Sequence, residues 1–409
     1  MTAHRTLMDL PKAKAGAELA QHWPLDPQVV FLNHGSYGAC PRPVLEAQQR
    51  LRERLEQNPV RFLNRELEPL LDEARQELAE FVGADPVNMT FVPNTTTGVN
   101  AILRSLRFKP GDELLTTSHA YNACTNALEF VAVGSQARVV QAQVPFPIES
   151  PAQVLDVILG AVTSRTRLAV LDHVTSQTGL VFPIERLVRE LRARGIETLV
   201  DGAHAPGMLP LNVEAIGAAY YVGNCHKWLC APKGAAFLHV RSERQSEIRP
   251  LAISHGANST RTDRSRFHLE FGWTGTHDPT AYLAVPVAIR FLGSLLPGGW
   301  PAVMTRNRAL VLEARQVLCR TLHVALPCPD EMVGTLVTLS LPSTPEDSPD
   351  PACTRDPLQE TLSSKFKIET SITVWPASRQ RLLRISAHLY NTSAQYARLA
   401  HALSQLLGS

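Results

Sequence analysis

A regular alternation of helical stretches and short apolar runs, which begins at about residue 70, constrains the fold of this chain more than any other feature. Strands that alternate with helices are typical of a mostly parallel sheet with crossover helices. We therefore predict an α/β fold with a doubly wound sheet. The apolar runs expected to form its strands are Glu113–Thr117, Ala137–Gln143, Arg167–His173, Glu197–Asp201 and Ala218–Val222.

The pattern changes after Pro279. Two long helical stretches and two strand-like runs follow there: Ala281–Leu296, Ala302–Leu322, Thr335–Leu341 and Leu382–Ala387. A chain of 409 residues also exceeds the length at which one hydrophobic core usually splits. We predict an N-terminal arm (residues 1–30), a large domain (31–279) and a smaller C-terminal α+β domain (280–409). A Pro-, Ser- and Asp-rich stretch, residues 342–352, predicts a surface loop.

The charge pattern argues against nucleic acid and membrane partners. The net charge is only +2, and acidic and basic residues are interspersed, so no strong field of one sign is expected. No apolar run approaches the roughly 20 residues needed to span a bilayer. The N-terminal residues lack the apolar core of a signal peptide. We predict a cytoplasmic protein that acts on a small molecule.

The counts of cysteine and lysine limit the chemistry. The seven cysteines are scattered singly, without CxxC spacing, which favours reduced thiols over disulfides and predicts no metal site. Lysine is rare compared with arginine, so few side chains could form a Schiff base. The seven lysines are Lys12, Lys14, Lys109, Lys227, Lys233, Lys365 and Lys367.

Two polar segments lie at predicted strand ends, where ligands of open α/β sheets collect. Thr95-Thr96-Thr97-Gly98 opens a helix, whose free N–H groups and positive dipole end can hold a phosphate. The alternative is a simple helix cap. Asp201 ends an apolar strand and is followed by small residues. Its carboxylate either caps the next turn or pairs with a protonated ring nitrogen.

A third segment, Gly223–Leu229, places Lys227 directly after a predicted strand. A single lysine at such a position is ordinarily an exposed surface residue. Here it adjoins Trp228, Leu229 and Cys230, which would desolvate its amine. Desolvation lowers the pKa of a lysine and favours the neutral amine that attacks an aldehyde.

In order and approximate spacing, these three segments resemble the class V aminotransferase family of fold-type I pyridoxal 5′-phosphate (PLP) enzymes, over nearly the whole chain. Within the family the chain is most similar to the isopenicillin N epimerase-like subgroup, whose relatives include sulfoxide lyases. Phe31–Gly38 near the N-terminus and Arg384–Asn391 near the C-terminus both match that subgroup. The resemblance implies a large domain with a mostly parallel seven-stranded sheet and a smaller C-terminal domain.

The resemblance also implies roles for the cofactor-binding residues. Lys227 would carry PLP and move the Cα proton of the substrate, and Asp201 would keep the pyridine nitrogen protonated. His204 would contact the cofactor O3′, or it only packs. The phosphate would be bound by Thr96, Thr97, Asn224 and His226, although His226 has packing as its alternative.

Aromatic and polar residues complete the implied site. Tyr121 would stack on the cofactor ring, with His119 as the alternative. Gln177, or Ser176 beside it, would face the cofactor or the substrate carboxylate. In the family a residue of the neighbouring subunit completes the phosphate site, and Thr276 matches it, which implies a homodimer.

Arg384 is the candidate for the substrate α-carboxylate, because a guanidinium makes two parallel hydrogen bonds to a carboxylate. Its alternative is a surface arginine at a strand end. Asn33, in the other matching segment, is a second candidate for substrate binding.

The reaction type is narrowed by one departure from the cysteine desulfurases of the family. Those enzymes carry a catalytic thiol shortly before the arginine, whereas Thr373–Arg379 contains no cysteine. Persulfide chemistry would then require Cys353 to reach inward. Epimerisation, β-elimination at a C–S bond and transamination all begin with loss of the Cα proton. We expect epimerase-like chemistry, with a C–S lyase or an aminotransferase as alternatives and a non-catalytic PLP-binding protein as a remote one.

Overall fold

The computed structural model of the protein describes residues 18–342, 356–375 and 379–408. Most of the predicted N-terminal arm, nearly all of the predicted loop at 342–352 and Cys353 lie outside these residues. The six cysteines within them are all buried and form no disulfide with one another.

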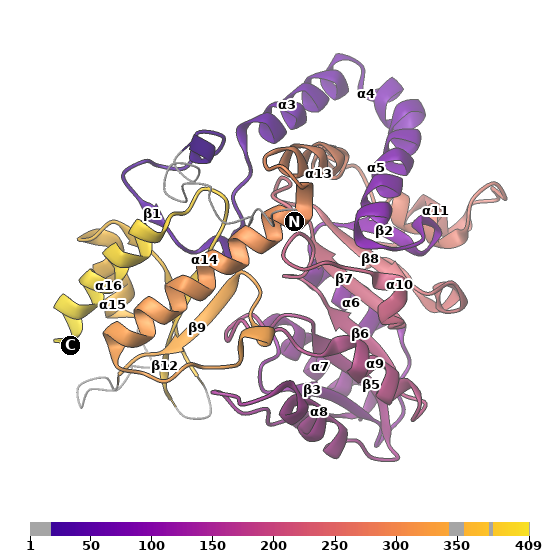
Figure 1. Cartoon of the computed structure of the whole chain (residues 1–409). Helices are drawn as coiled ribbons and strands as arrows, with labels where there is room; N and C mark the ends of the chain where they lie inside the picture. Colours follow the sequence, from indigo (N-terminus) through magenta and orange to yellow (C-terminus); the bar gives the residue numbers. More distant parts are fainter. Residues whose placement is uncertain (1–17, 343–355, 376–378, 409) are drawn as a thin grey trace, which may run out of the picture.

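A seven-stranded sheet forms the centre of the larger part of the molecule (Figure 1). Its strand order is β2-β8-β7-β6-β5-β3-β4. The neighbours from β4 to β7 run parallel, and β8 runs antiparallel to both β7 and β2. The predicted doubly wound α/β fold is therefore confirmed. The strands of this sheet are β2 (Met89–Val92), β3 (Glu113–Thr117), β4 (Arg138–Ala142), β5 (Thr166–Asp172), β6 (Glu197–Asp201), β7 (Tyr220–Asn224) and β8 (Ala236–Val240).

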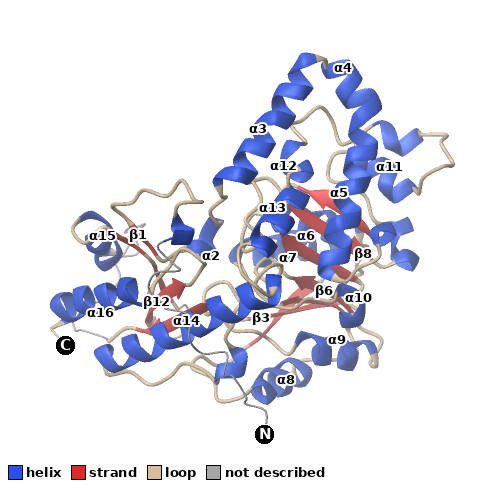
Figure 2. Cartoon of the chain, turned by 45° about the horizontal axis from the view of Figure 1, so that its top comes forward, coloured by secondary structure: helices blue, strands red, loops and turns tan. Residues whose placement is uncertain are grey.

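Helices cover the sheet on both faces (Figure 2). On β3, Leu114 packs into one apolar cluster and Leu115 into another. This alternation is the period of two that a strand buried on both faces requires. The helices up to residue 283 are α2 (His34–Tyr37), α3 (Arg42–Gln57), α4 (Pro59–Arg61), α5 (Leu67–Val82), α6 (Thr95–Ser105), α7 (Asn122–Ser135), α8 (Pro151–Gly160), α9 (Ile184–Arg192), α10 (Val213–Ile216), α11 (Arg266–Gly272) and α12 (Thr280–Leu283).

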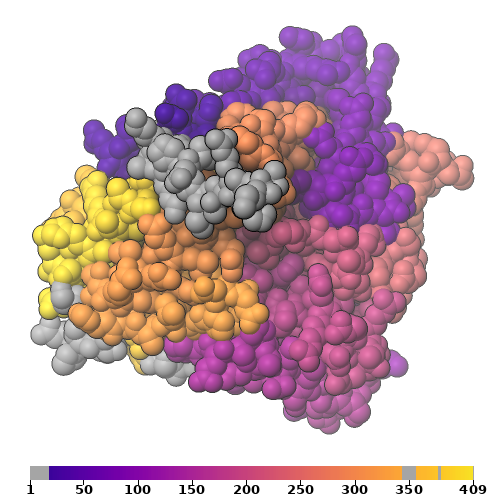
Figure 3. Space-filling view, in the orientation of Figure 1, coloured from indigo at the N-terminus to yellow at the C-terminus, as the bar shows by residue number. Residues whose placement is uncertain are grey.

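The C-terminal part forms a second lobe beside the larger part of the molecule (Figure 3). Its antiparallel sheet has the order β11-β12-β9, and a short parallel pair joins β1 near the N-terminus to β10. The boundary that we expect at residue 280 stays a prediction. The remaining elements are α13 (Val285–Ser294), α14 (Gly299–Leu322), α15 (Pro357–Ser364), α16 (Ser393–Leu407), β1 (Val30–Phe31), β9 (Leu336–Ser340), β10 (Ile368–Glu369), β11 (Ser371–Val374) and β12 (Arg381–Ser386).

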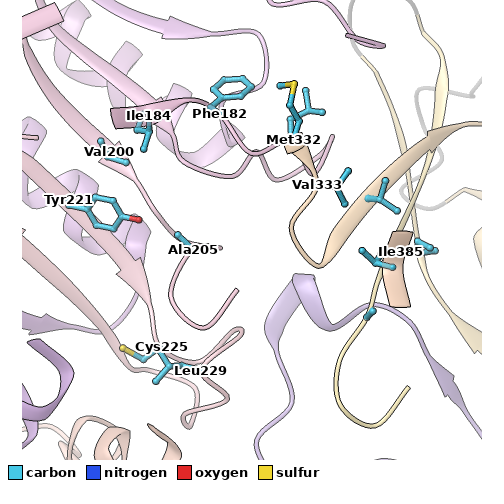
Figure 4. Packing of buried hydrophobic residues seen from close by; sticks show 14 of the residues in the cluster. Phe182, Ile184, Val200, Ala205, Tyr221, Cys225, Leu229, Met332, Val333 and Ile385 are labelled. Atoms are coloured by element: carbon cyan, nitrogen blue, oxygen red, sulfur yellow. The ribbon is translucent and has the colours of Figure 1, made fainter. Parts of the chain in front are cut away.

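One continuous apolar cluster joins the two lobes (Figure 4). It contains Val200 and Tyr221 of the large sheet, and Val333 and Ile385 from the C-terminal part. The cluster packs the large sheet against β12. Residues at the ends of the large strands are thereby held close to residues of the C-terminal part.

The single helix predicted at Ala281–Leu296 is wrong. The segment forms α12 and α13, which are separated at Ala284, and Pro286 lies in the first turn of α13. Proline has no backbone N–H and is tolerated only in the first turn of a helix, so a new helix starts there.

Among the described residues, no single helix is long and apolar enough to cross a membrane. One pair, Thr280–Ser294 and Gly299–Leu322, meets the length and composition of a span only when its two helices are combined across a 72° bend. Val285 and Val311 of this pair are buried in the core.

Candidate active site

Two aspartates lie side by side at the carboxyl ends of neighbouring strands. Asp172 ends β5, Asp201 ends β6, and the two are register partners in the parallel pair. Register partners on neighbouring strands point to the same face of a sheet, about 5 Å apart. Both side chains are buried. Burial, and for Asp172 also the charge of Asp201, raises the pKa of each carboxyl above its ordinary value. Two such close carboxylates resist ionising together.

Asp201 already accepts two hydrogen bonds. The backbone N–H of Ala203 donates to Oδ1 at 2.9 Å, and the Cys124 thiol donates to Oδ2 at 3.2 Å. These bonds hold the carboxylate at the strand end and leave further lone pairs for a donor. Asp201 is therefore able to accept a bond from a protonated ring nitrogen.

Lys227 follows β7, beside these strand ends, and its amine nitrogen lies 2.9 Å from His204 Nε2. The Trp228 indole N–H donates to the other ring nitrogen, His204 Nδ1, at 3.3 Å. Since an indole N–H can only donate, Nδ1 accepts and Nε2 carries the proton of the neutral ring. That proton points at the lone pair of the Lys227 amine, so the arrangement requires a neutral lysine.

The electrostatic environment of Lys227 shifts its amine toward the neutral form. Burial and then the positive charge of Arg384 lower its pKa to about 8. Burial holds the pKa of His204 well below its usual range, so its ring is neutral. The site thus provides an amine that loses its proton easily.

The predicted phosphate residues lie around the start of α6. Asn94 caps this helix by accepting a bond from the Thr97 N–H at 2.8 Å, and Asn224 Oδ1 accepts from the Thr95 N–H at 3.0 Å. Within the part of the chain that the structure describes, the amide and hydroxyl of Thr96 have no hydrogen-bond partner. A free amide at a helix N-terminus can donate to an anion.

His226 presents one ring nitrogen to its own chain. Its Nδ1 lies 3.1 Å from the Ala235 carbonyl, which can only accept, so Nδ1 carries a proton. Burial and the nearby Lys227 lower the pKa of His226 to about 4. A neutral His226 therefore offers Nε2 only as an acceptor. It could donate to a phosphate only if the anion raised its pKa.

Arg384 lies on β12 and is held by the N-terminal segment. Its Nη2 donates to Ser36 Oγ at 2.7 Å and to Asn33 Oδ1 at 3.2 Å, and its Nη1 donates to the Ser176 carbonyl at 2.6 Å. Ser36 Oγ in turn donates to Asn33 Oδ1 at 2.7 Å. Burial lowers the pKa of Arg384 to about 10. Its Nε is buried and has no partner in the described residues, so the Nε–H is a donor available to a ligand.

A cavity of about 320 Å³ opens beside Arg384. Tyr121, Ser176 and Gln177 also line it, and Tyr121 is 47% exposed. His119, in contrast, is buried and both of its ring nitrogens are occupied. Nδ1 bonds to Thr178 at 2.7 Å and Nε2 to the Val144 carbonyl at 3.0 Å. Of the two candidates for stacking, Tyr121 is the one that lines the cavity, and its stacking role stays a prediction.

Thr276 lies in the loop between α11 and α12. It is exposed and does not line the cavity beside Arg384. Its role at the phosphate of a second subunit stays a prediction.

Two residues that sequence reasoning missed are part of this arrangement. Asp172 is the last residue of its strand, as Asp201 is. This position could have identified Asp172 as a site residue from the sequence. Ser36 gave no such signal, because its partner Arg384 lies 348 positions away in the chain.

The residues at this edge of the sheet fit the cofactor that the resemblance implies. They offer a neutral amine for an aldehyde, a carboxylate for a pyridinium and a free amide for a phosphate. The buried Nε of Arg384, without a partner in the described residues, adds a donor suited to a carboxylate. Lys227, Asp201 and Thr96 would hold PLP, which supplies an electron sink when bound.

Comparisons with known proteins agree with this geometry. The chain matches the aminotransferase class-V family over residues 30–318. It is 36% identical to the isopenicillin N epimerase of Streptomyces clavuligerus over 94% of this chain and 96% of that protein. It is 30% identical to a probable chloroplastic L-cysteine desulfhydrase of Arabidopsis thaliana over 96% and 85% of the two chains.

Among solved structures, the fold matches a C-DES mutant with glycine covalently linked to its PLP cofactor. The TM-score is 0.77 and the identity 22%, over 94% of this chain and 98% of that chain. The predicted fold class is therefore confirmed. The chain belongs to the class V aminotransferase family of fold-type I PLP enzymes.

Proposed function

We propose that this protein is a PLP-dependent enzyme that removes the Cα proton of an amino acid, with Lys227 as the base and epimerisation as the outcome. The observation that carries the proposal is the hydrogen-bond pattern around Lys227, in which the proton of His204 Nε2 requires a neutral amine. A neutral, partly buried amine can both attack an aldehyde and accept a proton.

Each neighbouring residue has a part that follows from its contacts. Asp201 would hold a proton on the ring nitrogen, and His204 would orient the Lys227 amine. Arg384, held by Asn33 and Ser36, would bind the substrate carboxylate through its free Nε. Tyr121 would cover the cavity from the side of α7 and keep water from the reacting carbon.

The epimerase assignment depends on the epimerase relative, which is 36% identical over nearly the whole chain. The desulfhydrase relative supports a second candidate, a lyase that breaks a C–S bond after the same first step. Both reactions need a carboxylate site and a base at Cα. They differ in whether a leaving group departs from Cβ.

We further propose a cytoplasmic homodimer. Thr276 is exposed, as expected for a residue that completes the site of a partner subunit. Sedimentation of the holoprotein tests this directly. A monomer with full cofactor affinity would contradict it.

The proposal is tested by the visible absorption of the purified protein. The wild type should be yellow with PLP, and Lys227→Ala should lose this band after dialysis. Lys233→Met is the matched control, because Lys233 lies in the same loop but donates to the Gly38 carbonyl at 3.0 Å. The control should stay yellow. A wild type that stays colourless with added PLP would contradict the proposal.

A further inference from the structure

The short helix α2 connects the two functional ends of the site. Asn33, which caps the helix, and Ser36 both accept hydrogen bonds from Arg384. His34, from the first turn, lies with Nε2 at 3.0 Å from the Lys227 carbonyl oxygen. The same four-residue helix therefore contacts the guanidinium at one end of the site and the lysine backbone at the other.

The hydrogen bonds of His34 fix which of its nitrogens carries the proton. A carbonyl can only accept, so the bond to Lys227 requires a proton on Nε2. Nδ1 of the neutral ring then accepts, and the Tyr390 hydroxyl, at 2.7 Å, must donate to it. Burial lowers the pKa of His34 to about 3, which keeps the ring neutral. The direction of both bonds is thus determined.

The surrounding contacts leave His34 little freedom. Its backbone N–H donates to Ser386 Oγ at 2.7 Å, and Ser386 Oγ donates to the Leu32 carbonyl at 2.9 Å. Gly38, which ends the helix, lies so close to the lysine loop that an added Cβ would approach the His226 carbonyl oxygen to 2.0 Å. The helix and the lysine loop are packed backbone against backbone.

We propose that Tyr390 and His34 form a two-bond relay from the C-terminal lobe to the Lys227 carbonyl, which positions the lysine for its reaction. Both are positioning residues, because neither contacts the amine itself. The relay depends on the proposed function in one respect, namely that Lys227 carries the cofactor. The role that the relay gives to His34 and Tyr390 is separate from the binding of the cofactor and of the substrate.

A metal site at the same residues is a weaker interpretation. His34, Cys230 and His388 place three potential ligand atoms within 4.8 Å of one another. The two imidazole rings, however, are stacked with centroids 4.2 Å apart and an interplanar angle of 18°. The nitrogen lone pairs lie in these nearly parallel planes and do not converge on one ion. Cys230 Sγ instead lies 3.4 Å from His388 Nε2, a hydrogen-bond contact.

The relay is tested with variants that remove one bond each. Tyr390→Phe removes the donor to Nδ1, and His34→Leu removes the bond to Lys227. His34→Gln keeps an amide N–H near the position of Nε2. Tyr396→Phe is the matched control, because Tyr396 is also buried and its hydroxyl makes one hydrogen bond, at 2.8 Å to the Ser386 carbonyl.

The readout is a pH titration of the visible band of the holoprotein together with the PLP dissociation constant. Tyr390→Phe and His34→Leu should shift the pKa of the band and weaken PLP binding by roughly fivefold, as expected for one lost hydrogen bond. His34→Gln should restore both values toward the wild type. Tyr396→Phe should lower stability without moving the band. If Tyr390→Phe and His34→Leu behave like this control, the relay is wrong.

A second readout separates the relay from the proposed function. In ¹⁵N-histidine spectra of the apoprotein, His34 should be the neutral tautomer with the proton on Nε2. A proton on Nδ1 would overturn the relay whether or not PLP binds. A colourless wild type with the expected tautomer would instead refute the cofactor assignment alone.

Discussion

Arg384 illustrates how single side chains set the chemistry of this site. Three of its contacts, with Asn33, Ser36 and the Ser176 carbonyl, are made within the chain and orient the guanidinium. Its Nε stays free of partners among the described residues and is buried. A buried donor without a partner costs free energy, and a bound carboxylate would recover that cost.

We expect Arg384→Ala to weaken binding of an amino-acid substrate by roughly 2 to 5 kcal/mol, the loss expected when one partner of a buried charged pair is removed. The effect should appear mainly in KM. Arg381→Ala is the control on the same strand, because Arg381 pairs with Asp356. It should lower stability and leave KM unchanged. An unchanged KM for Arg384→Ala would refute the carboxylate role.

The Asp172 carboxyl makes the stability of the fold depend on pH. Burial and the charge of Asp201 raise its pKa in the folded protein well above the ordinary value of 3.8. The folded state therefore binds a proton that the unfolded state releases, and stability is lost as the pH rises above about 4. Asp172→Asn removes this loss.

In urea unfolding of the apoprotein, the stability of Asp172→Asn relative to the wild type should increase between pH 5 and pH 8. A difference that does not change with pH would show that Asp172 titrates normally. The comparison uses the difference between two proteins, so titrating groups remote from Asp172 cancel.

At the scale of elements, the contact between α2 and the lysine loop is the most sensitive to substitution. Gly38 ends α2 with φ of +71°, a conformation that L side chains rarely adopt. A Cβ there would also collide with the His226 carbonyl. The segment must therefore carry glycine if the loop that follows β7 is to keep its position.

Gly38→Ala should destabilise the protein by several kcal/mol and weaken PLP binding, because the loop with Lys227 must move. Gly134→Ala is the control, since Gly134 lies in α7 and an added Cβ there meets nothing within 4 Å. That variant should be stabilised by about 1 kcal/mol. Thermal unfolding and PLP titration measure both effects. A Gly38→Ala protein that matches the wild type would contradict the packing described here.

The elements differ in how well local sequence predicts them. The strands of the large sheet from β3 to β7 were predicted within two residues at each end, because apolar runs between helices are a local signal. The edge strand β2 and its neighbour β8 were not identified. The break between α12 and α13 was missed because an apolar helical pattern continues through Pro286.

The site residues also differ in how well local sequence predicts them. Asp201, Lys227 and the start of α6 follow strands, so their place at the sheet edge can be derived from the pattern. Arg384 was predicted from the resemblance to the family and not from a local pattern. The contacts of Ser36 with Arg384 and of His34 with Tyr390 join residues about 350 positions apart. Such contacts depend on tertiary packing and have no local signature.

For the whole molecule, buried neutral histidines predict acid sensitivity. Burial lowers the pKa of His34 to about 3, and that of His119 and His173 to about 4. The unfolded chain binds protons at these residues below about pH 6.5, whereas the folded chain does not. Each histidine therefore destabilises the fold by up to about 1.4 kcal/mol per pH unit between pH 6.5 and its lowered pKa.

The free energy of unfolding should accordingly fall by several kcal/mol as the pH decreases from 6.5 to 4. His119→Gln, which removes one titrating group, should show a shallower slope over the same range. Urea unfolding at several pH values gives both slopes. Equal slopes for the two proteins would mean that His119 titrates normally in the folded state.

The central claim, removal of the Cα proton by Lys227, is tested most directly by hydrogen exchange. The holoprotein is incubated in D₂O with a panel of L-amino acids and cysteine conjugates, and deuterium at Cα is measured by NMR. The account predicts exchange with at least one substrate and none with Lys227→Ala. The products then identify the reaction: the enantiomer for an epimerase, or a released thiol for a C–S lyase. A wild type that binds PLP but exchanges no Cα hydrogen across the panel would contradict the account.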